Sequence, residues 1–156
     1  VTNSSQFEIR AQKNLLSIFI SNVAFENYPK LSKMLPEGII RDETLIIVKN
    51  TIDKLYQTIN NVKELIKDLY TEFIENDNIT HIITDLVEMS EAFKTLNETE
   101  LESAVMENIA RLKRYYSEKE AKDLSRQYHE VNNDDLEALK IQMQLRDRIQ
   151  FRTGDK

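Results

Sequence analysis

Apolar residues recur at alternating steps of three and four through the middle of this 156-residue chain. Such spacing places side chains on one face of an α-helix, and a sustained rhythm of this kind is typical of coiled-coil and bundle seams. It predicts one seam after Asp42, a residue suited to cap a helix, and a second seam after the Asn-Asp-Asn turn at 76–78. The seam positions are Leu45, Val48, Ile52, Leu55, Ile59, Val62, Ile66, Leu69 and Phe73, then Ile79, Ile82, Leu86, Met89, Phe93 and Leu96.

The opening segment predicts a helix that is buried on several sides. The S-x-x-E sequence at residues 5–8 matches a capping box. Apolar residues between 15 and 23 cover most of a helix circumference, so we expect a first helix over about 5–26. Pro29 and the Pro-Glu-Gly sequence at 36–38 then interrupt the chain, with a short helical turn between them.

The pattern loosens in the last third of the chain. Hydrophobic residues make up 42 of the first 97 residues but 21 of the last 59. A second capping box at residues 99–102 predicts a further helix, whose apolar stripe is interrupted at Lys119 and Asp123 and resumes on a shifted phase. The Asn/Asp cluster at 132–135 is suited to kink or split this helix. The expected interface positions are Leu112, Tyr116, Leu124, Tyr128, Val131, Leu139 and Met143.

These patterns predict an all-α protein with two parts. Residues 1–98 form a helical head, a bundle shared with a partner chain, because its seams are too broad for one neighbouring helix. Residues 99–156 form a long coiled-coil stalk, whose single stripe cannot make a core alone. These seam and stripe positions of the two parts, from Leu45 to Met143 and without Leu96, are therefore candidates for partner binding.

Composition narrows the possible functions. The chain has only 2 Gly and 2 Pro, too few for a turn-rich sheet protein, and no Cys for disulfides or thiolate metal sites. Its formal net charge of -6 disfavours direct nucleic-acid binding and favours basic partner segments. No apolar run reaches the roughly 20 residues that span a bilayer, and the first residues do not resemble a signal peptide. We expect an intracellular protein that contacts no membrane.

Candidate chemistry is sparse. His81 and His129 lie on different predicted helices, away from other ligands at metal spacing. Glu72-x-x-Glu75 and Asp85-x-x-Glu88 lie on consecutive helices, as do the Mg²⁺ ligands of all-α nucleoside-triphosphate pyrophosphohydrolases. Solvated helix faces also carry acids at this spacing, so we assign the four residues to such faces. We expect no catalytic residue, no metal and no cofactor.

The order of features resembles the Nnf-one or polyamine-modulated-factor subunit of the kinetochore MIND complex. The resemblance begins with Ile9-Arg10-x-x-Lys13 in an opening helix, followed by Leu35-Pro36, where the family often has Phe-Pro. A long helix then ends in Glu72-Phe73-Ile74. After a short acidic turn, Asn78-Ile79 starts a helix that contains Leu86-Val87-Glu88-Met89, where the family favours a Leu-Asp-x-Leu pattern. A long C-terminal helix completes the layout.

This resemblance implies a non-catalytic scaffold in the nucleus, at the kinetochore. Such a subunit pairs with a homologous helical subunit, and further coiled-coil chains join their stalks into a rod. Its head receives basic segments of inner-kinetochore proteins, and the rod connects them to the microtubule-binding outer kinetochore. Two alternatives stay open: a small helical regulatory or immunity-type bundle acting alone or as a homodimer, and a Mg²⁺-dependent nucleotide pyrophosphohydrolase.

Overall fold

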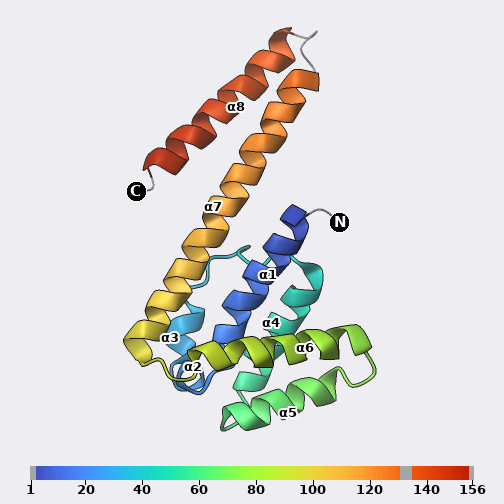
Figure 1. The fold of residues 1–156 in the computed structure, drawn as a ribbon, viewed down its shortest axis with the longest axis vertical. Coiled ribbons are helices and arrows are strands. Elements are labelled where there is room, and N and C mark those ends of the chain that lie inside the picture. The colour runs from blue at the N-terminus through green and yellow to red at the C-terminus, as the bar shows by residue number, and fades with distance from the viewer. Residues whose placement is uncertain (1–2, 131–134, 155–156) are drawn as a thin grey trace. The chain divides into compact units, whose positions relative to one another are not determined.

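The structure, a computed structural model, describes residues 3–130 and 135–154, with the side chains of 6–129 and 139–148, and all regular secondary structure in this part is helical. This confirms the all-α prediction (Figure 1). The chain divides into two compact units, a head unit of residues 1–110 and a C-terminal unit of residues 111–156. The helices are α1 (Asn3–Ile18), α2 (Asn22–Glu26), α3 (Tyr28–Ser32), α4 (Glu43–Tyr56), α5 (Val62–Glu72), α6 (Asp77–Ser90), the 3₁₀ helix η1 (Glu91–Phe93), α7 (Glu98–Glu130) and α8 (Asp135–Gly154).

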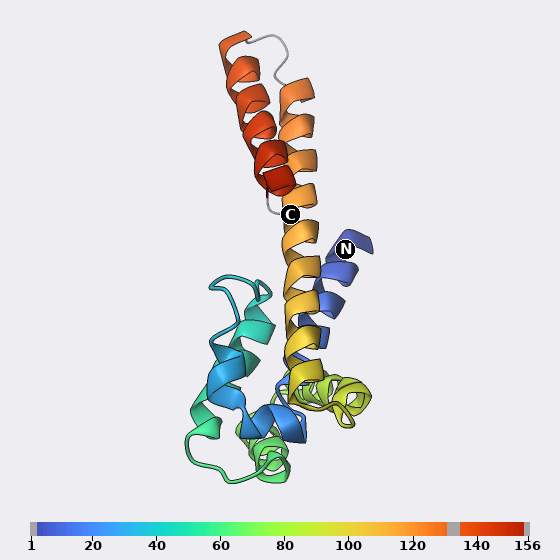
Figure 2. The ribbon, with the colours of Figure 1, turned by 90° about the vertical axis from the view of Figure 1, so that its left-hand side faces the viewer.

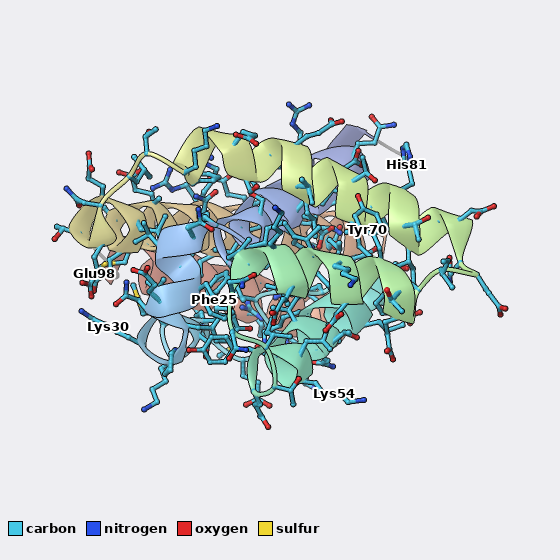
Figure 3. The ribbon with its side chains drawn as sticks, turned by 90° about the horizontal axis from the view of Figure 1, so that it is seen from below. Phe25, Lys30, Lys54, Tyr70, His81 and Glu98 are labelled. Atoms are coloured by element: carbon cyan, nitrogen blue, oxygen red, sulfur yellow. The ribbon has the colours of Figure 1, made fainter. Side chains whose placement is uncertain are left out.

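Helix α1 is the centre of the head unit. It packs against α6 and α4, while α5 packs against both α4 and α6 (Figures 1 and 3). Large apolar side chains fill the space between these helices, and the completely buried ones include Leu15, Ile18, Leu45, Leu65, Ile83 and Leu86. Each such side chain contributes roughly 1.5–3 kcal/mol when it leaves water. The head unit therefore encloses a hydrophobic core within a single chain.

The first helix is shorter than predicted, because the chain turns at residues 19–21. The Ser21 hydroxyl donates to the Ile18 carbonyl at 2.8 Å and accepts from the Ala24 N–H at 3.3 Å. One side chain thus ends α1 and caps the start of α2. The predicted single helix to residue 26 is wrong, and Ser5 lies inside α1 instead of capping it.

The seam after Asp42 is also divided. Asp42 caps α4 as predicted, accepting from the Leu45 N–H at 3.1 Å, but α4 ends at Tyr56 and α5 begins only at Val62. Asn61 caps α5 by accepting from the Glu64 N–H at 2.9 Å. The three–four spacing continues across this break, so periodicity alone does not reveal it. The two halves fold back on each other as a helical hairpin.

The next junctions follow the predicted chemistry with shifted positions. Asn76 caps α6, as expected for the turn at 76–78, by accepting from the Ile79 N–H at 3.0 Å. Helix α6 ends at Ser90, short of the predicted Leu96. The capping box that opens α7 joins Asn97 and Glu100, two residues earlier than predicted, with reciprocal bonds of 3.0 and 2.8 Å.

The C-terminal third forms two helices. Helix α7 ends at Glu130 and α8 starts at Asp135, as the Asn/Asp cluster predicts, although residues 131–134 lie outside the described part. Within the C-terminal unit, α8 runs antiparallel to the second half of α7 (Figures 1 and 2). A coiled coil is not established by this arrangement. The division after residue 110 also places the first turns of α7 with the head, beyond the boundary expected after residue 98.

Candidate interaction surface

Nine of the 21 residues predicted to bind a partner are covered by the chain itself. In the head unit, the seams provide the core between α1, α4, α5 and α6, and in the C-terminal unit two stripe residues are equally buried. Their role in partner binding stays a prediction, but the structure gives a partner no access to them. The buried members are Leu45, Val48, Ile52, Val62, Leu69, Ile79, Leu86, Leu112 and Tyr116.

A second group of predicted residues is half-buried, at the borders of these faces. It comprises Leu55, Ile59, Ile66, Phe73, Ile82, Met89, Phe93, Leu124 and Tyr128. Only Leu139 and Met143 are clearly exposed, at 52% and 56% of their surface. Val131 lies outside the described residues. The accessible part of the predicted partner surface is therefore concentrated on α8.

Other exposed apolar residues of the head unit come from separate segments. They are Phe7, Ile47, Ile74 and Met106, on or beside four different helices. The partner-binding positions predicted from the spacing include none of these four residues. Ile47, Ile74 and Met106 lie off the three–four spacing of their segments, and that offset indicates an outward position.

Helix α8 carries apolar residues on two sides. Ile141 is 7% exposed and Leu145 is half-buried, while Arg148 forms an ion pair with Glu120 of α7. Leu139 and Met143 lie on the opposite side of α8 from Ile141. Each is two residues away from Ile141, and a step of two residues turns about 200° around a helix with 3.6 residues per turn. Sequence reasoning chose Leu139 and Met143 but missed Ile141 and Leu145, which pack towards α7.

An open groove of about 660 Å³ runs between α7 and α8. Its lining residues, all but Leu124 polar or charged, are Glu120, Asp123, Leu124, Gln144, Asp147 and Arg148. Three carboxylates and one guanidinium leave it with a negative balance. The groove lies beside the Leu139–Met143 side of α8 and does not include either apolar residue.

Three consecutive residues of α1 fix the architecture of the head unit. Gln12, which is 1% exposed, accepts from the backbone N–H groups of Arg41 and Asp42 at 2.9 Å each. Lys13 forms an ion pair with Asp85 of α6 at 3.0 Å. Asn14 donates to the Asn108 side chain of α7 at 2.9 Å. Because these bonds diverge to a loop and two helices, they define the rotation of α1 about its axis.

A second polar cluster joins α3 to α4. Tyr28 is 5% exposed, and its hydroxyl donates to Asp53. The Asp53 carboxylate also accepts from Lys49 at 2.8 Å. The Tyr28 ring stacks on Tyr56 with centroids 4.2 Å apart. Burial, followed by the bond to Asp53, raises the pKa of Tyr28 far above its ordinary value, because a phenolate would lose water and face a carboxylate. Tyr28 therefore stays protonated in the folded protein.

Lys30 joins α3 to the start of α7. Its Nζ lies 3.3 Å from both Glu98 and Glu102 (Figure 3). Bonds to these two carboxylates raise the pKa of Lys30. These ion pairs are at the surface, so they orient α3 against the start of α7 more than they stabilise the fold.

The acids of the hydrolase alternative do not gather into a site. Glu72, Glu75 and Glu88 are exposed, and Asp85 is the ion-pair partner of Lys13. Within the described residues, no group of three or more His, Asp or Glu could hold a metal ion. His81 points away from the head into solvent (Figure 3). This geometry offers no support for Mg²⁺-dependent hydrolysis.

Comparisons with known proteins find no match for this chain among family models, curated proteins or solved structures. None of the described helices combines the length and the apolar character that crossing a membrane requires.

Proposed function

We propose that this chain is a non-catalytic helical scaffold subunit of a kinetochore linker complex. The observation that carries the proposal is the unequal burial of its two units. The head unit completes its own core, whereas α8 leaves Leu139 and Met143 exposed on the side away from Ile141. A surface helix with apolar residues on two sides requires a second neighbour, and α7 supplies only one. Such a helix is suited to assembly with another chain.

The order of the motifs supports the more specific assignment, while the expected long second helix and long last helix are each divided in two. The Ile9-Arg10-x-x-Lys13 sequence lies on α1, where Lys13 joins α6, and Leu35-Pro36 precedes a tight turn in which Gly38 has a φ of 80°. Leu86 and its neighbours lie on α6, and two further helices complete the chain. The proposed partners are a homologous helical subunit and further coiled-coil chains, and the proposed location is the nucleus. The net charge of -6 supports basic inner-kinetochore segments as ligands of the head.

The test is localisation combined with affinity capture in the source organism. The tagged chain is expected at centromeres through mitosis, and it should co-purify with helical chains in fixed stoichiometry. Diffuse localisation in every phase of division, with no helical chain captured, would overturn the kinetochore assignment. The chain should also be captured from extracts treated with nuclease, because no direct nucleic-acid contact is proposed.

A second candidate function is favoured by the closed core of the head unit. A chain that buries residues such as Leu15, Leu45 and Leu86 without help is also suited to act alone, as a helical regulatory bundle. Light scattering and thermal unfolding of the isolated chain distinguish the two. A stable monomer that captures no partner favours the regulator, and a chain that forms a fixed complex with a helical partner favours the scaffold.

A further inference from the structure

The side of α8 that faces away from α7 combines exposed apolar and exposed basic residues. Leu139 and Met143 share one face, and Arg146 lies in line with Leu139 because seven residues complete about two turns. Lys140 borders the same face, and both cations are exposed. In the described part of the chain neither forms an ion pair. We call Leu139, Lys140, Met143 and Arg146 the α8 outer face.

Charge on the outer face indicates the chemistry of its occupant. Its two cations contrast with the net charge of -6 of the whole chain. Asp147 is also exposed and lies one turn after Met143, so this side of α8 carries one carboxylate beside its two cations. Asp147 also lines the acidic groove, where Arg148 and Glu120 form an ion pair. A partner that covers Leu139 and Met143 must therefore place its flanking residues beside Lys140 and Arg146. Carboxylates at those positions would gain from both cations.

We propose that the α8 outer face docks an acidic amphipathic helix of another chain, a helix with apolar residues at three–four spacing flanked by Glu or Asp. This inference rests on the proposed scaffold function and specifies its partner. A helix fits because Leu139 and Met143 present one turn of a seam, and in sequence Leu136 continues it, although that side chain is outside the described set. A second copy of α8 is the competing occupant, and sedimentation of the chain alone tests for it.

The experiment uses the full chain and two synthetic helical peptides. Both peptides carry Leu at three–four spacing, and they differ only in whether Glu or Lys flanks the Leu positions. Fluorescence anisotropy should show that the Glu peptide binds at least about tenfold more tightly than the Lys peptide, with an advantage that shrinks as salt rises. Equal binding of the two peptides, or no binding of either, would overturn the proposal.

Two sets of variants locate the site. Leu139→Ser with Met143→Ser should weaken Glu-peptide binding by about tenfold or more, since both side chains lose apolar contact. Lys140→Glu with Arg146→Glu should reverse the preference in favour of the Lys peptide. Ile74→Ser is the matched control, because Ile74 is 72% exposed on the head unit and should not affect binding. All these residues are exposed, so the variants should unfold at the temperature of the parent chain.

Two further outcomes would contradict the proposal. Unchanged peptide binding by the Leu139/Met143 variant would place the site elsewhere. Sedimentation of the chain alone as a dimer that this variant dissociates would identify a second copy as the occupant. Neither outcome bears on the kinetochore assignment, which depends on localisation and capture. Normal centromere localisation of the Lys140/Arg146 variant, with loss of one helical partner, would support both proposals.

Discussion

The same three–four spacing of apolar residues has different outcomes in the head unit and in the C-terminal unit. In the head, residues at three–four spacing are buried by neighbouring helices of the same chain, as Leu45 and Leu86 show. In the C-terminal unit, Leu139 and Met143 follow the same spacing and remain about half exposed. The comparison teaches that periodicity identifies the apolar face of a helix but not the chain that covers it.

The difference arises from the turns. Three head helices begin with an Asn whose side chain accepts from an N–H three residues later, namely Asn61, Asn76 and Asn97. Each such cap satisfies backbone N–H groups that a helix start leaves without a partner, at about 1 kcal/mol per cap. These turns let short helices reverse and cover one another. In the C-terminal unit, α8 covers only one side of α7.

The largest expected effect comes from truncating the chain near the boundary between the two units. A chain truncated after residue 98 loses Leu101, Val105 and Ile109, which are 0%, 0% and 8% exposed. At roughly 1.5–3 kcal/mol each, their loss removes about 5–9 kcal/mol, comparable with the whole stability of a small domain. We expect circular dichroism to show that this chain is unfolded and that a chain ending at residue 110 keeps its helices.

The longer truncation serves as the control for the shorter one. Both chains lack the C-terminal unit, so they differ only in the first turns of α7. A cooperative thermal transition in the chain ending at 98 would show that those turns are not part of the head.

The next effect sharpens the contrast between the two surfaces. Leu86→Asp places a carboxylate in the core of the head, while Leu139→Asp places one on the α8 outer face. We expect roughly 4 kcal/mol or more of destabilisation for the first, from lost burial and an unpaired buried charge. The second should stay within about 0.5 kcal/mol. Urea denaturation of each variant measures both values.

Equal losses in these two variants would mean that α8 is buried as deeply as α6. The measurement uses the isolated chain, because a partner bound to α8 would add its own stabilisation. Under the proposed function, Leu139→Asp then weakens partner capture without reducing the stability of the chain alone.

Much of the fold could be predicted from the sequence, in particular its helical class and most of its breaks. Asp42 and Asn76 cap the helices they were expected to cap, because an Asx residue before an apolar run is a local signal. The break between α4 and α5 was missed, because Ile59 and Val62 preserve the three–four spacing through the turn. Ser21 was missed for a similar reason, since apolar residues on all sides of a helix hide its end.

The candidate surface was less predictable than the fold. Leu139 and Met143 were chosen for their spacing, and the structure leaves them exposed. Nine other candidates are buried inside the chain, because a sequence pattern carries no information on whether a covering helix belongs to the same chain. The bonds of Gln12 and Asn14 could not be predicted, since each joins residues far apart in sequence and depends on the rotation of α1.

A smaller effect tests how the first turns of α7 are held to the head. Asn108 accepts from Asn14 and donates to the Ala104 carbonyl at 2.7 Å. Asn108→Ala leaves the partly buried Asn14 amide without its acceptor, which should cost about 1–3 kcal/mol. A double-mutant cycle with Asn14→Ala should give a coupling free energy of about 1 kcal/mol. A coupling near zero would show that the two side chains act independently.

The smallest expected effect concerns pH and belongs to the head alone. Tyr28 has a raised pKa, so the folded state keeps its phenolic proton at pH values where the unfolded state, with a pKa of 10.0, releases it. A state that binds more protons loses stability as pH rises, so this stabilisation is complete below pH 10 and declines above it. Tyr28→Phe should therefore flatten the fall in stability above pH 10. It should also cost about 1 kcal/mol at neutral pH through the lost bond to Asp53.

Urea denaturation at a series of pH values from 8 to 11 measures this difference. Lys30 and Lys94 also have raised pKa values, owing to their carboxylate partners, so the loss of their protons lowers stability over the same alkaline range. Both lysines are present in the parent chain and in Tyr28→Phe, and the difference between the two chains isolates the phenol. Tyr128→Phe in the C-terminal unit is the matched control and should follow the parent chain. Parallel curves for the parent and Tyr28→Phe would show that Tyr28 ionises in the folded head as readily as in the unfolded chain, and the cluster with Asp53 would then be open to water.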